Sequence, residues 1–337
     1  MRIQDLLKKG REVLGSCERC KLSGLDDGVG STFLSDAEIL LAFVLGMSKE
    51  ELIIHANDEI SDNVSEKLFM EYIGEVACGK PVAYITKSKE FYGLDFYVDE
   101  RVLIPRPETE MVVDVVLGYL KYRPTISDET GKIDLGKDFK MLDIGTGSLN
   151  IPVAVLHNFE NILAQAVDKS AKALEVAVLN REYYGLEDRI EIYESDLLSS
   201  VGEKFFDVIT ANLPYVGTSA NNFLEEGVRK NEPEIALFGG EDGFDLHRKL
   251  FEQIKEKGMD FNLLVGEFGM GQEELARYEL SKYFPENGKQ IDNQYDENGI
   301  VDKFCDKVDG QIGYKIEIKK DLAGIPRIYI VRKVGSG

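Results

Sequence analysis

The stretch MLDIGTGS, residues 141–148, joins a short apolar run to a glycine-rich turn. The run Met141–Ile144 is typical of a buried strand, and an amphipathic helix is predicted just after it, at about 147–158. Glycines at such a turn let the backbone approach a ligand, and the helix N-terminus offers free N–H groups. The sequence therefore predicts a βα unit whose turn holds a ligand through Gly145, Thr146 and Gly147. A tight turn that binds nothing is the alternative.

Short apolar runs alternate with amphipathic segments along the rest of the chain, which is typical of βαβ units and a parallel sheet. The expected strands are Met141–Ile144, Leu163–Val167, Ile190–Tyr193, Phe206–Thr210 and Phe261–Val265. Helices are expected at about 147–158, 170–184, 243–257 and 271–283. The last two runs, Tyr314–Ile318 and Arg327–Val331, are separated by a turn too short for a parallel crossover, so they are predicted to be antiparallel.

Residues 1–82 are predicted to form a helical domain. Within it, SDAE (35–38) has the spacing of a capping box, in which Ser35 and Glu38 satisfy free amides at a helix start. Residues 83–104 carry aromatic and β-branched residues around a glycine and are predicted to form a β-hairpin linker. The remaining residues, 105–337, are predicted to form the α/β domain, with a surface insertion at about 285–313.

The charge balance of the 337 residues is acidic, with 61 Asp and Glu against 40 Lys and Arg and a net charge of −21. Binding along nucleic-acid phosphates requires a clustered basic surface, so the composition argues against that class of protein. Four cysteines cannot form a disulfide framework, the N-terminus lacks a signal-peptide pattern, and no apolar run reaches the roughly 18 residues of a membrane span. We expect a cytoplasmic protein with no membrane segment.

CERC, residues 17–20, is a C-x-x-C pair. Structural zinc needs four ligands, and Cys78 and Cys305 are isolated in the sequence. The three histidines show no ligand spacing. We therefore expect no metal site.

Asp168 ends the next predicted strand, where a carboxylate can accept hydrogen bonds from both hydroxyls of a ribose. A dinucleotide fold requires G-x-G-x-x-G, and here Asn150 stands in place of the last glycine, which disfavours NAD. S-adenosylmethionine has a ribose and an adenine but no phosphate, and D-x-G-x-G with a strand-end acid suffices for it. Asp196 follows the third strand and is expected near the adenine. A polar strand end is the other interpretation of Asp196.

FDVITANLPY, residues 206–215, carries a buried strand into an amide, a proline turn and an aromatic ring at the sheet edge where α/β proteins bind ligands. The lone pair of an amide or exocyclic amine is delocalised, so it attacks a methyl group only when acceptors hold its hydrogens. The predicted acceptors are Asn212 Oδ1 and the Leu213 carbonyl, and Asn212 is also expected to lie next to the cofactor. Pro214 is expected to shape the turn, and Tyr215 to pack on the flat face of the substrate group. Positioning of this kind contributes as much as about 7–11 kcal/mol. An ordinary strand exit is the alternative.

Several further stretches resemble the HemK/PrmC family of protein-glutamine methyltransferases. They are SDAEILL (35–41), PVAYI (81–85), FYGL (91–94), LIPRPETE (103–110), EPEIALFGGEDG (232–243) and DLAG (321–324) with Arg327. The resemblance implies a Rossmann-like, seven-stranded class I methyltransferase domain, an N-terminal helical domain that binds the substrate, and a connecting β-hairpin. It also implies methyl transfer from S-adenosylmethionine to the glutamine side-chain amide in the Gly-Gly-Gln motif of peptide chain release factors.

Two positions depart from the family pattern. Leu213 stands where the family usually has the first proline of Asn-Pro-Pro-Tyr, and Leu149 stands where the cofactor loop usually has a glycine. A carbonyl at position 213 is supplied by leucine as well as by proline, with some loss of rigidity. A leucine at 149 leaves the placement of the following helix as an open question.

Two other functions share these motifs. Ribosomal RNA adenine dimethyltransferases also use Asn-Leu-Pro-Tyr, and a binding protein with the same fold could have lost catalysis through Leu149 and Leu213. The acidic charge and the family stretches outside the catalytic loop favour the release factor as substrate, with a basic docking surface on that partner. We expect a monomer that does not contact nucleic acid directly.

Overall fold

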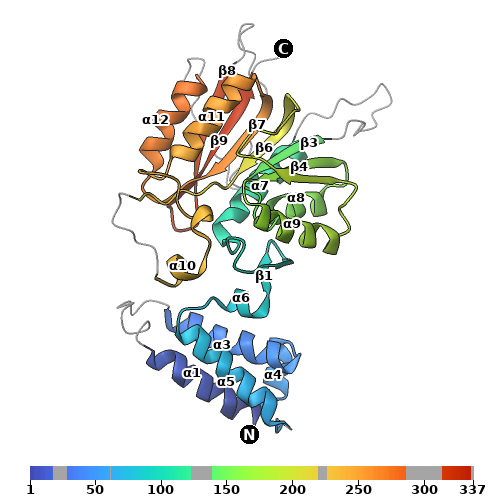
Figure 1. Ribbon diagram of the computed structural model, residues 1–337, viewed down its shortest axis with the longest axis vertical. Helices are drawn as coiled ribbons and strands as arrows, with labels where there is room; N and C mark the ends of the chain where they lie inside the picture. Colours follow the sequence, from blue (N-terminus) through green and yellow to red (C-terminus); the bar gives the residue numbers. More distant parts are fainter. Residues whose placement is uncertain (18–28, 61, 123–138, 219–225, 286–312, 335–337) are drawn as a thin grey trace. The chain divides into compact units, whose positions relative to one another are not determined.

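The computed structural model describes residues 1–17, 29–60, 62–122, 139–218, 226–285 and 313–334. Contacts divide the chain into two units, the first comprising 1–88, 98–100 and 223–233, and the second 89–97, 101–222 and 234–337 (Figure 1). The expected insertion at about 285–313 lies outside the described residues apart from its end residues. No helix in these described ranges has the length and apolarity to cross a membrane.

The first unit is helical, as the sequence predicts. Its core forms where α1, α3 and α5 pack against one another, and Gly10 lets Phe69 approach, because a Cβ there would lie 2.5 Å from the Phe69 ring. Its elements are α1 (Ile3–Ser16), α3 (Val29–Leu45), α4 (Lys49–Ile54), α5 (Asn63–Ala77), α6 (Val82–Thr86) and α10 (Glu226–Asn231).

The capping box expected at residues 35–38 is wrong, because α3 begins at Val29 and places Ser35 inside the helix. Glu38 instead pairs with Arg11 of α1. A capping box is present at α4, where Ser48 Oγ accepts from the Glu51 amide at 3.1 Å and Glu51 Oε2 accepts from the Ser48 amide at 2.7 Å. The spacing marks a helix start only where the preceding chain is not already helical.

Helix α10 is distant in sequence from the rest of the first unit. Asn231 Nδ2 donates to the Gly79 carbonyl at 2.9 Å, just after α5. The sequence boundaries place this segment within 105–337, whereas the contacts group it with the N-terminal helices. Only the tertiary structure could assign it.

The hairpin predicted for residues 83–104 is present but shorter, because α6 occupies the beginning of that range and contacts group residues 89–97 with the second unit. Its strands, β1 (Ser88–Phe91) and β2 (Leu94–Tyr97), form a two-stranded sheet. Tyr92 and Gly93 both have positive φ, at 55° and 74°, which is the geometry of a tight two-residue turn.

The second unit contains a seven-stranded sheet in the order β5-β4-β3-β6-β7-β9-β8. The first five strands pair in parallel, and β9 is antiparallel to both β7 and β8, so the predicted sheet and its closing hairpin are confirmed. The strands are β3 (Phe139–Ile144), β4 (Ile162–Asp168), β5 (Ile190–Glu194), β6 (Phe205–Ala211), β7 (Asp260–Glu267), β8 (Gly313–Lys320) and β9 (Pro326–Val334).

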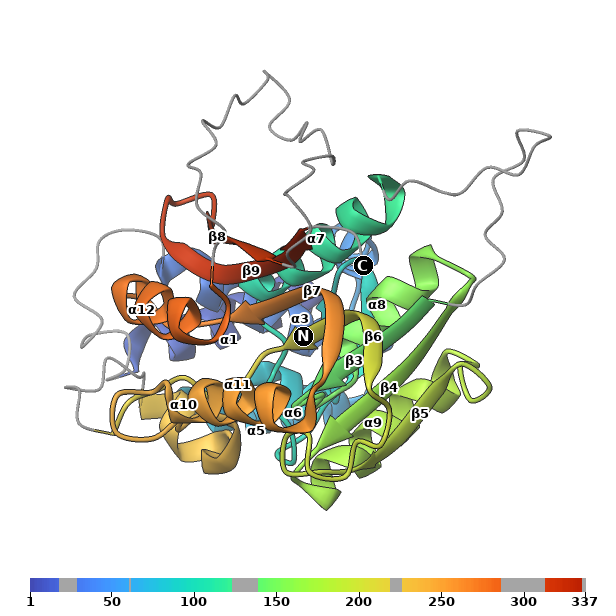
Figure 2. The same cartoon turned by 90° about the horizontal axis from the view of Figure 1, so that it is seen from above.

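Helices cover both faces of this sheet (Figure 2). On one face α11 and α12 pack together over a core of aromatic and aliphatic side chains, and on the other α7 lies beside α8. The helices are α7 (Glu110–Tyr122), α8 (Asn150–Asn158), α9 (Ala171–Tyr183), α11 (Asp245–Lys257) and α12 (Glu273–Tyr283), with short 3-10 helices η1 (Pro107–Thr109) and η2 (Glu234–Ala236). The four predicted helices are confirmed to within three residues.

Candidate active site

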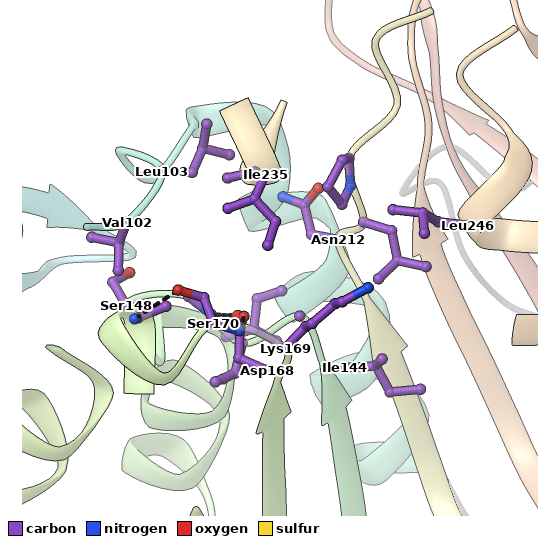
Figure 3. A pocket seen from close by; sticks show the side chains of 18 of the residues that line it. Val102, Leu103, Ile144, Ser148, Asp168, Lys169, Ser170, Asn212, Ile235 and Leu246 are labelled. Carbon is purple, nitrogen blue, oxygen red and sulfur yellow. Dashed lines mark hydrogen bonds between the residues drawn. The ribbon is translucent and has the colours of Figure 1, made fainter. Parts of the chain in front are cut away.

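A cavity lies at the carboxyl ends of β3, β4 and β6, entirely within the second unit. Figure 3 shows Asp168, Asn212 and Ile235 lining it from β4, from the segment after β6 and from η2. Parallel strands place their ends at one sheet edge, which is where such folds bind ligands. The predicted residues that line the cavity are Gly145, Thr146, Gly147, Asp168, Asp196, Asn212, Leu213 and Pro214.

The glycine turn lies against the start of the NLPY segment. Gly145 and Gly147 have φ of 73° and 53°, a conformation that favours glycine. A Cβ on Gly145 would lie 3.2 Å from Leu213 Cδ2 and 3.5 Å from the Asn212 carbonyl oxygen. The amides of Gly145 and Thr146 both donate to the Val167 carbonyl, at 2.8 and 3.0 Å, which ties the turn to β4.

The carboxylate of Asp168 fixes the same turn. Its Oδ2 accepts from the Gly147 amide at 3.0 Å, and its Oδ1 accepts from the Ser170 amide at 2.8 Å. Burial raises the pKa of Asp168, although these backbone hydrogen bonds oppose the effect. Each oxygen has a further lone pair that can accept from a ligand.

Asp143 lies beneath the turn at the end of β3. It is buried and accepts from Thr210 Oγ1 at 2.6 Å. Burial raises the pKa of Asp143 to about 6, against the lowering effect of that hydrogen bond, and the charge of Asp168 adds to the rise. The motif alone predicts no role for Asp143, because its contact with β6 is tertiary.

Asp196 lines the cavity as part of an ion-pair cluster. Its Oδ2 accepts from Lys249 Nζ at 2.7 Å and lies 3.4 Å from Lys169 Nζ. The hydrogen bond from Lys249 lowers the pKa of Asp196, so the carboxylate is ionised at neutral pH. Lysines on both sides of this residue were not anticipated from the sequence.

A hydrogen-bonded chain runs behind the NLPY segment. Asn212 Nδ2 donates to Thr109 Oγ1 at 3.0 Å, and Thr109 Oγ1 donates to Glu267 Oε2 at 2.6 Å. Tyr215 donates its hydroxyl hydrogen to Glu267 Oε1 at 3.2 Å. Tyr215 is not among the residues that line the cavity.

Glu267 is buried at 2% exposure, at the end of β7. Burial raises its pKa to about 7, while the hydrogen bonds from Thr109 and Tyr215 lower it. Burial also raises the pKa of Tyr215, with the nearby charge of Glu267 adding to the effect. Thr109 lies in the LIPRPETE stretch, but 158 residues separate it from Glu267, so no local pattern predicts that the two touch.

Two glycines of the family stretch at 232–243 lie against the backbone of the NLPY segment. A Cβ on Gly239 would lie 2.1 Å from the Pro214 carbonyl oxygen, and one on Gly243 would lie 2.1 Å from the Tyr215 carbonyl oxygen. Both positions therefore require glycine, because the backbone of the NLPY segment comes too close to leave room for a side chain.

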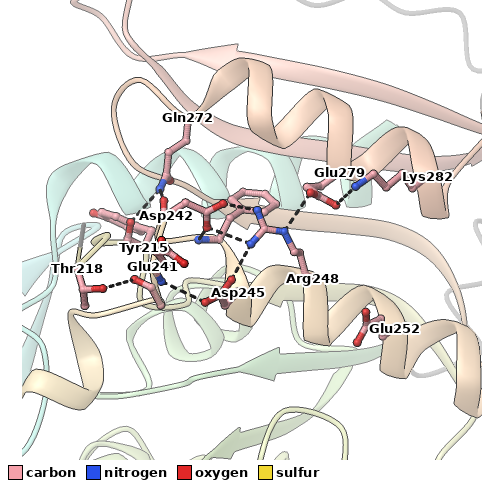
Figure 4. A network of polar contacts seen from close by, with 12 residues as sticks. Tyr215, Thr218, Glu241, Asp242, Asp245, Arg248, Glu252, Gln272, Glu279 and Lys282 are labelled. Atoms are coloured by element: carbon pink, nitrogen blue, oxygen red, sulfur yellow. Dashed lines mark hydrogen bonds and ion pairs between the residues drawn. The ribbon is translucent and has the colours of Figure 1, made fainter. Parts of the chain in front are cut away.

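Gln272 and Arg248 hold this backbone contact in place (Figure 4). Gln272 Nε2 donates to the carbonyls of Tyr215, at 3.0 Å, and Asp242, at 2.9 Å. Arg248 pairs with Asp242 and also contacts Asp245 and Glu279. The turn at Asp242 is thus fixed by Arg248 of α11 and by Gln272, the residue that precedes α12.

Leu149 adopts a left-handed conformation, with φ of 68°, as the residue that caps the N-terminus of α8. Its side chain is fully buried. The positive φ explains why the family usually has a glycine at this position. In this chain the backbone strain of a left-handed leucine is offset by the burial of its side chain. Leu213 is also buried, at 3% exposure.

Among the described residues, no group of three or more His, Cys, Asp and Glu side chains is arranged to hold a metal ion. Cys17 is described, whereas Cys20 of the C-x-x-C pair lies outside the described ranges.

Comparison with known proteins gives consistent matches over both units. The family model of the PrmC N-terminal domain matches residues 29–86, and that of the methyltransferase small domain matches residues 132–230. The chain is 30% identical to the release factor glutamine methyltransferase of Clostridium acetobutylicum over 338 residues, covering 99% of this chain and 100% of that protein. It is 32% identical to the enzyme of the same name from Bacillus cereus, covering 89% and 96% of the two chains.

Among solved structures, the chain is similar to the hMettl16 catalytic domain, with 14% identity and a TM-score of 0.48 over 74% of this chain and 79% of that chain.

Proposed function

The chain belongs to the family of release factor glutamine methyltransferases, and we propose that it transfers a methyl group from S-adenosylmethionine to a glutamine side-chain amide of a peptide chain release factor, in its Gly-Gly-Gln motif. One observation supports this most directly. The glycine turn with Asp168 and the segment that begins at Asn212 line the same cavity. A cofactor bound at the glycine turn and a substrate amide bound at Asn212 would therefore lie in one cavity, close enough to react.

The residues that line the cavity fit S-adenosylmethionine. Both oxygens of Asp168 keep acceptor capacity for the two ribose hydroxyls, because each accepts one backbone amide. The left-handed glycines at 145 and 147 present backbone without a Cβ. When bound, this cofactor supplies the electrophilic methyl group. Asp196 lines the cavity, is ionised and accepts from Lys249, which supports the proposal that it accepts a hydrogen bond from the exocyclic amine of the adenine.

The substrate nitrogen is held by two acceptors from consecutive residues. Asn212 Oδ1 and the Leu213 carbonyl accept its two hydrogens, so its lone pair is directed at the methyl group. Pro214 restricts Leu213 to extended backbone, which fixes the direction of that carbonyl even though position 213 is not a proline. No base is needed before transfer, because the nitrogen loses its proton after it has been methylated.

The experiment is incubation of the purified protein with labelled S-adenosylmethionine and either a purified release factor or ribosomal RNA. The expected result is label on the factor alone, lost when the Gly-Gly-Gln glutamine of the factor is replaced by alanine. Label on RNA with none on the factor overturns the proposal. If the protein shows an intact circular dichroism spectrum but does not bind S-adenosylmethionine in calorimetry, it is instead a binding protein that has the fold without the catalytic activity.

A further inference from the structure

Asn212 has an amide whose two ends have opposite hydrogen-bonding character. Its Oδ1 accepts hydrogen bonds and its Nδ2 donates them. The proposed reaction requires the oxygen at the substrate, since a donor there would face the hydrogens of the substrate amide. Something in the protein must therefore select one of the two orientations of the Asn212 side chain.

The direction of the hydrogen bonds behind Asn212 makes this selection. An ionised carboxylate only accepts, so whenever Glu267 is ionised Thr109 must donate its single hydroxyl hydrogen to it, at 2.6 Å. The Thr109 oxygen is then left as an acceptor and takes a hydrogen from Asn212 Nδ2, at 3.0 Å. If the amide were reversed, its oxygen would meet an oxygen that has no hydrogen to give.

The same carboxylate also holds the other end of the motif. Glu267 Oε1 accepts from the Tyr215 hydroxyl at 3.2 Å, so one side chain ties residues 212 and 215 together. The sheet explains the placement, because β6 and β7 are neighbours and Ala211 pairs with Gly266 in register. Thr109 is 1% exposed and Glu267 is 2% exposed, so water does not compete for these contacts.

We infer that Thr109 and Glu267 are positioning residues that orient the Asn212 amide, with its Oδ1 kept for the substrate nitrogen. Among the described residues, none donates a hydrogen bond to Asn212 Oδ1, which is consistent with an acceptor reserved for a ligand. The inference rests on the proposed function for its activity test, but the orientation itself can be measured without catalysis.

The first test compares Thr109→Val with Thr109→Ser. Valine keeps the shape of threonine and removes the hydroxyl, whereas serine keeps the hydroxyl and removes the methyl group. Positioning predicts that Thr109→Val lowers kcat by about 100-fold with unchanged affinity for S-adenosylmethionine, while Thr109→Ser stays within a few-fold of the original protein. A role in packing alone predicts the reverse order, and that order overturns the inference.

The second test uses side-chain amide hydrogen exchange by NMR on protein labelled with ¹⁵N-asparagine. The Asn212 signal is identified as the one missing from Asn212→Ala. It is expected to exchange slowly in the original protein and in Thr109→Ser, and fast in Thr109→Val. Equal exchange in all three overturns the inference. Because this measurement needs no methyl acceptor, an original protein that methylates no release factor would refute the proposed function separately.

Glu267→Gln gives a further readout in the pH profile. The groups that act on Glu267 are Thr109 and Tyr215 through hydrogen bonds, Glu108 by repulsion and Arg327 by attraction. When Glu267 is protonated, its own hydrogen faces the hydroxyl of Thr109 or Tyr215, and that hydroxyl no longer donates to it. The kcat of the original protein is therefore expected to fall as the pH drops below about 7. Glu267→Gln is expected to have low kcat throughout and to lack this fall. If kcat of Glu267→Gln falls by the same factor below this pH, the titrating group is not Glu267, and Glu267 has no positioning role.

Discussion

Replacing Glu267 by glutamine is expected to make the protein more stable at neutral pH although it impairs the site. The carboxyl group is 2% exposed, and burial raises its pKa from the usual 4.5 to about 7. Each pH unit between these values corresponds to about 1.4 kcal/mol, so ionised Glu267 lowers the free energy of unfolding by about 3 kcal/mol relative to the protonated group. Glutamine has nearly the shape of the protonated form and carries no charge.

The sign of the pH dependence follows from proton binding. Because the folded state holds this proton more tightly than the unfolded state, the contribution of Glu267 to stability is fully present below pH 4.5 and is lost as the pH rises to about 7. Glu267→Gln lacks that decline. The difference in unfolding free energy between variant and original is therefore expected to be constant below pH 4.5, to grow by about 1.4 kcal/mol per pH unit up to about 7, and to be constant above that.

The assay is urea unfolding followed by circular dichroism at a series of pH values from 4 to 8.5, since the chain has no tryptophan. Glu279→Gln is the matched control. Glu279 is also buried, but hydrogen bonds from Lys282 and Arg248 outweigh burial and lower the pKa of Glu279. Its stabilising contribution is complete above the unfolded-state pKa of 4.5 and is lost only as the pH falls below that value. The difference between Glu279→Gln and the original is therefore expected to stay nearly constant from about pH 5 to 8.5, where the difference for Glu267→Gln grows and then levels off.

A difference between Glu267→Gln and the original that does not change with pH would refute the reasoning, because it would mean that Glu267 is not ionised against a burial cost. The same conclusion would follow if both variants changed in the same direction. Other titrating groups, including buried His247, cancel when two proteins that share them are compared at one pH.

Further predictions concern the motif, its supports and the charge. Asn212→Ala is expected to keep S-adenosylmethionine affinity in calorimetry and to lose turnover by about 100-fold, with Asn158→Ala as a control. Leu149→Ala is expected to lower the free energy of unfolding by about 2–5 kcal/mol. Leu149→Gly is expected to lower it by about 1 kcal/mol less, because only glycine adopts the φ of 68° without strain, and equal losses would contradict this. Gln272→Ala, which removes the hydrogen bond to the Tyr215 carbonyl, should lower kcat more than cofactor affinity in steady-state assays. The association rate with a release factor is expected to fall as salt increases, in stopped-flow measurements, and a rate independent of salt would leave the net charge of −21 without a role in docking.

Local patterns in the sequence determined much of this protein. Alternating apolar runs and helical spacing predicted the parallel sheet, its helices and the closing antiparallel hairpin, because those elements are set by side-chain periodicity and turn length. The glycine turn and Asp168 were predicted to adjoin because each ends a strand, and parallel strands end at one edge. The failed capping box at Ser35 shows the limit of the same method, since a four-residue pattern does not report what precedes it.

Only the tertiary structure decided which groups contact the NLPY segment from behind. Asn212 and Glu267 come from a strand exit and a neighbouring strand end, which pairing of β6 with β7 brings together, and Thr109 of η1 hydrogen-bonds to both. The assignment of α10 to the first unit likewise depends on a contact with Gly79, 152 residues away. Periodicity and spacing carry information over one element or one turn. Contacts between elements far apart in the chain depend on how the sheet is ordered and how its helices pack, and these are properties of the folded molecule.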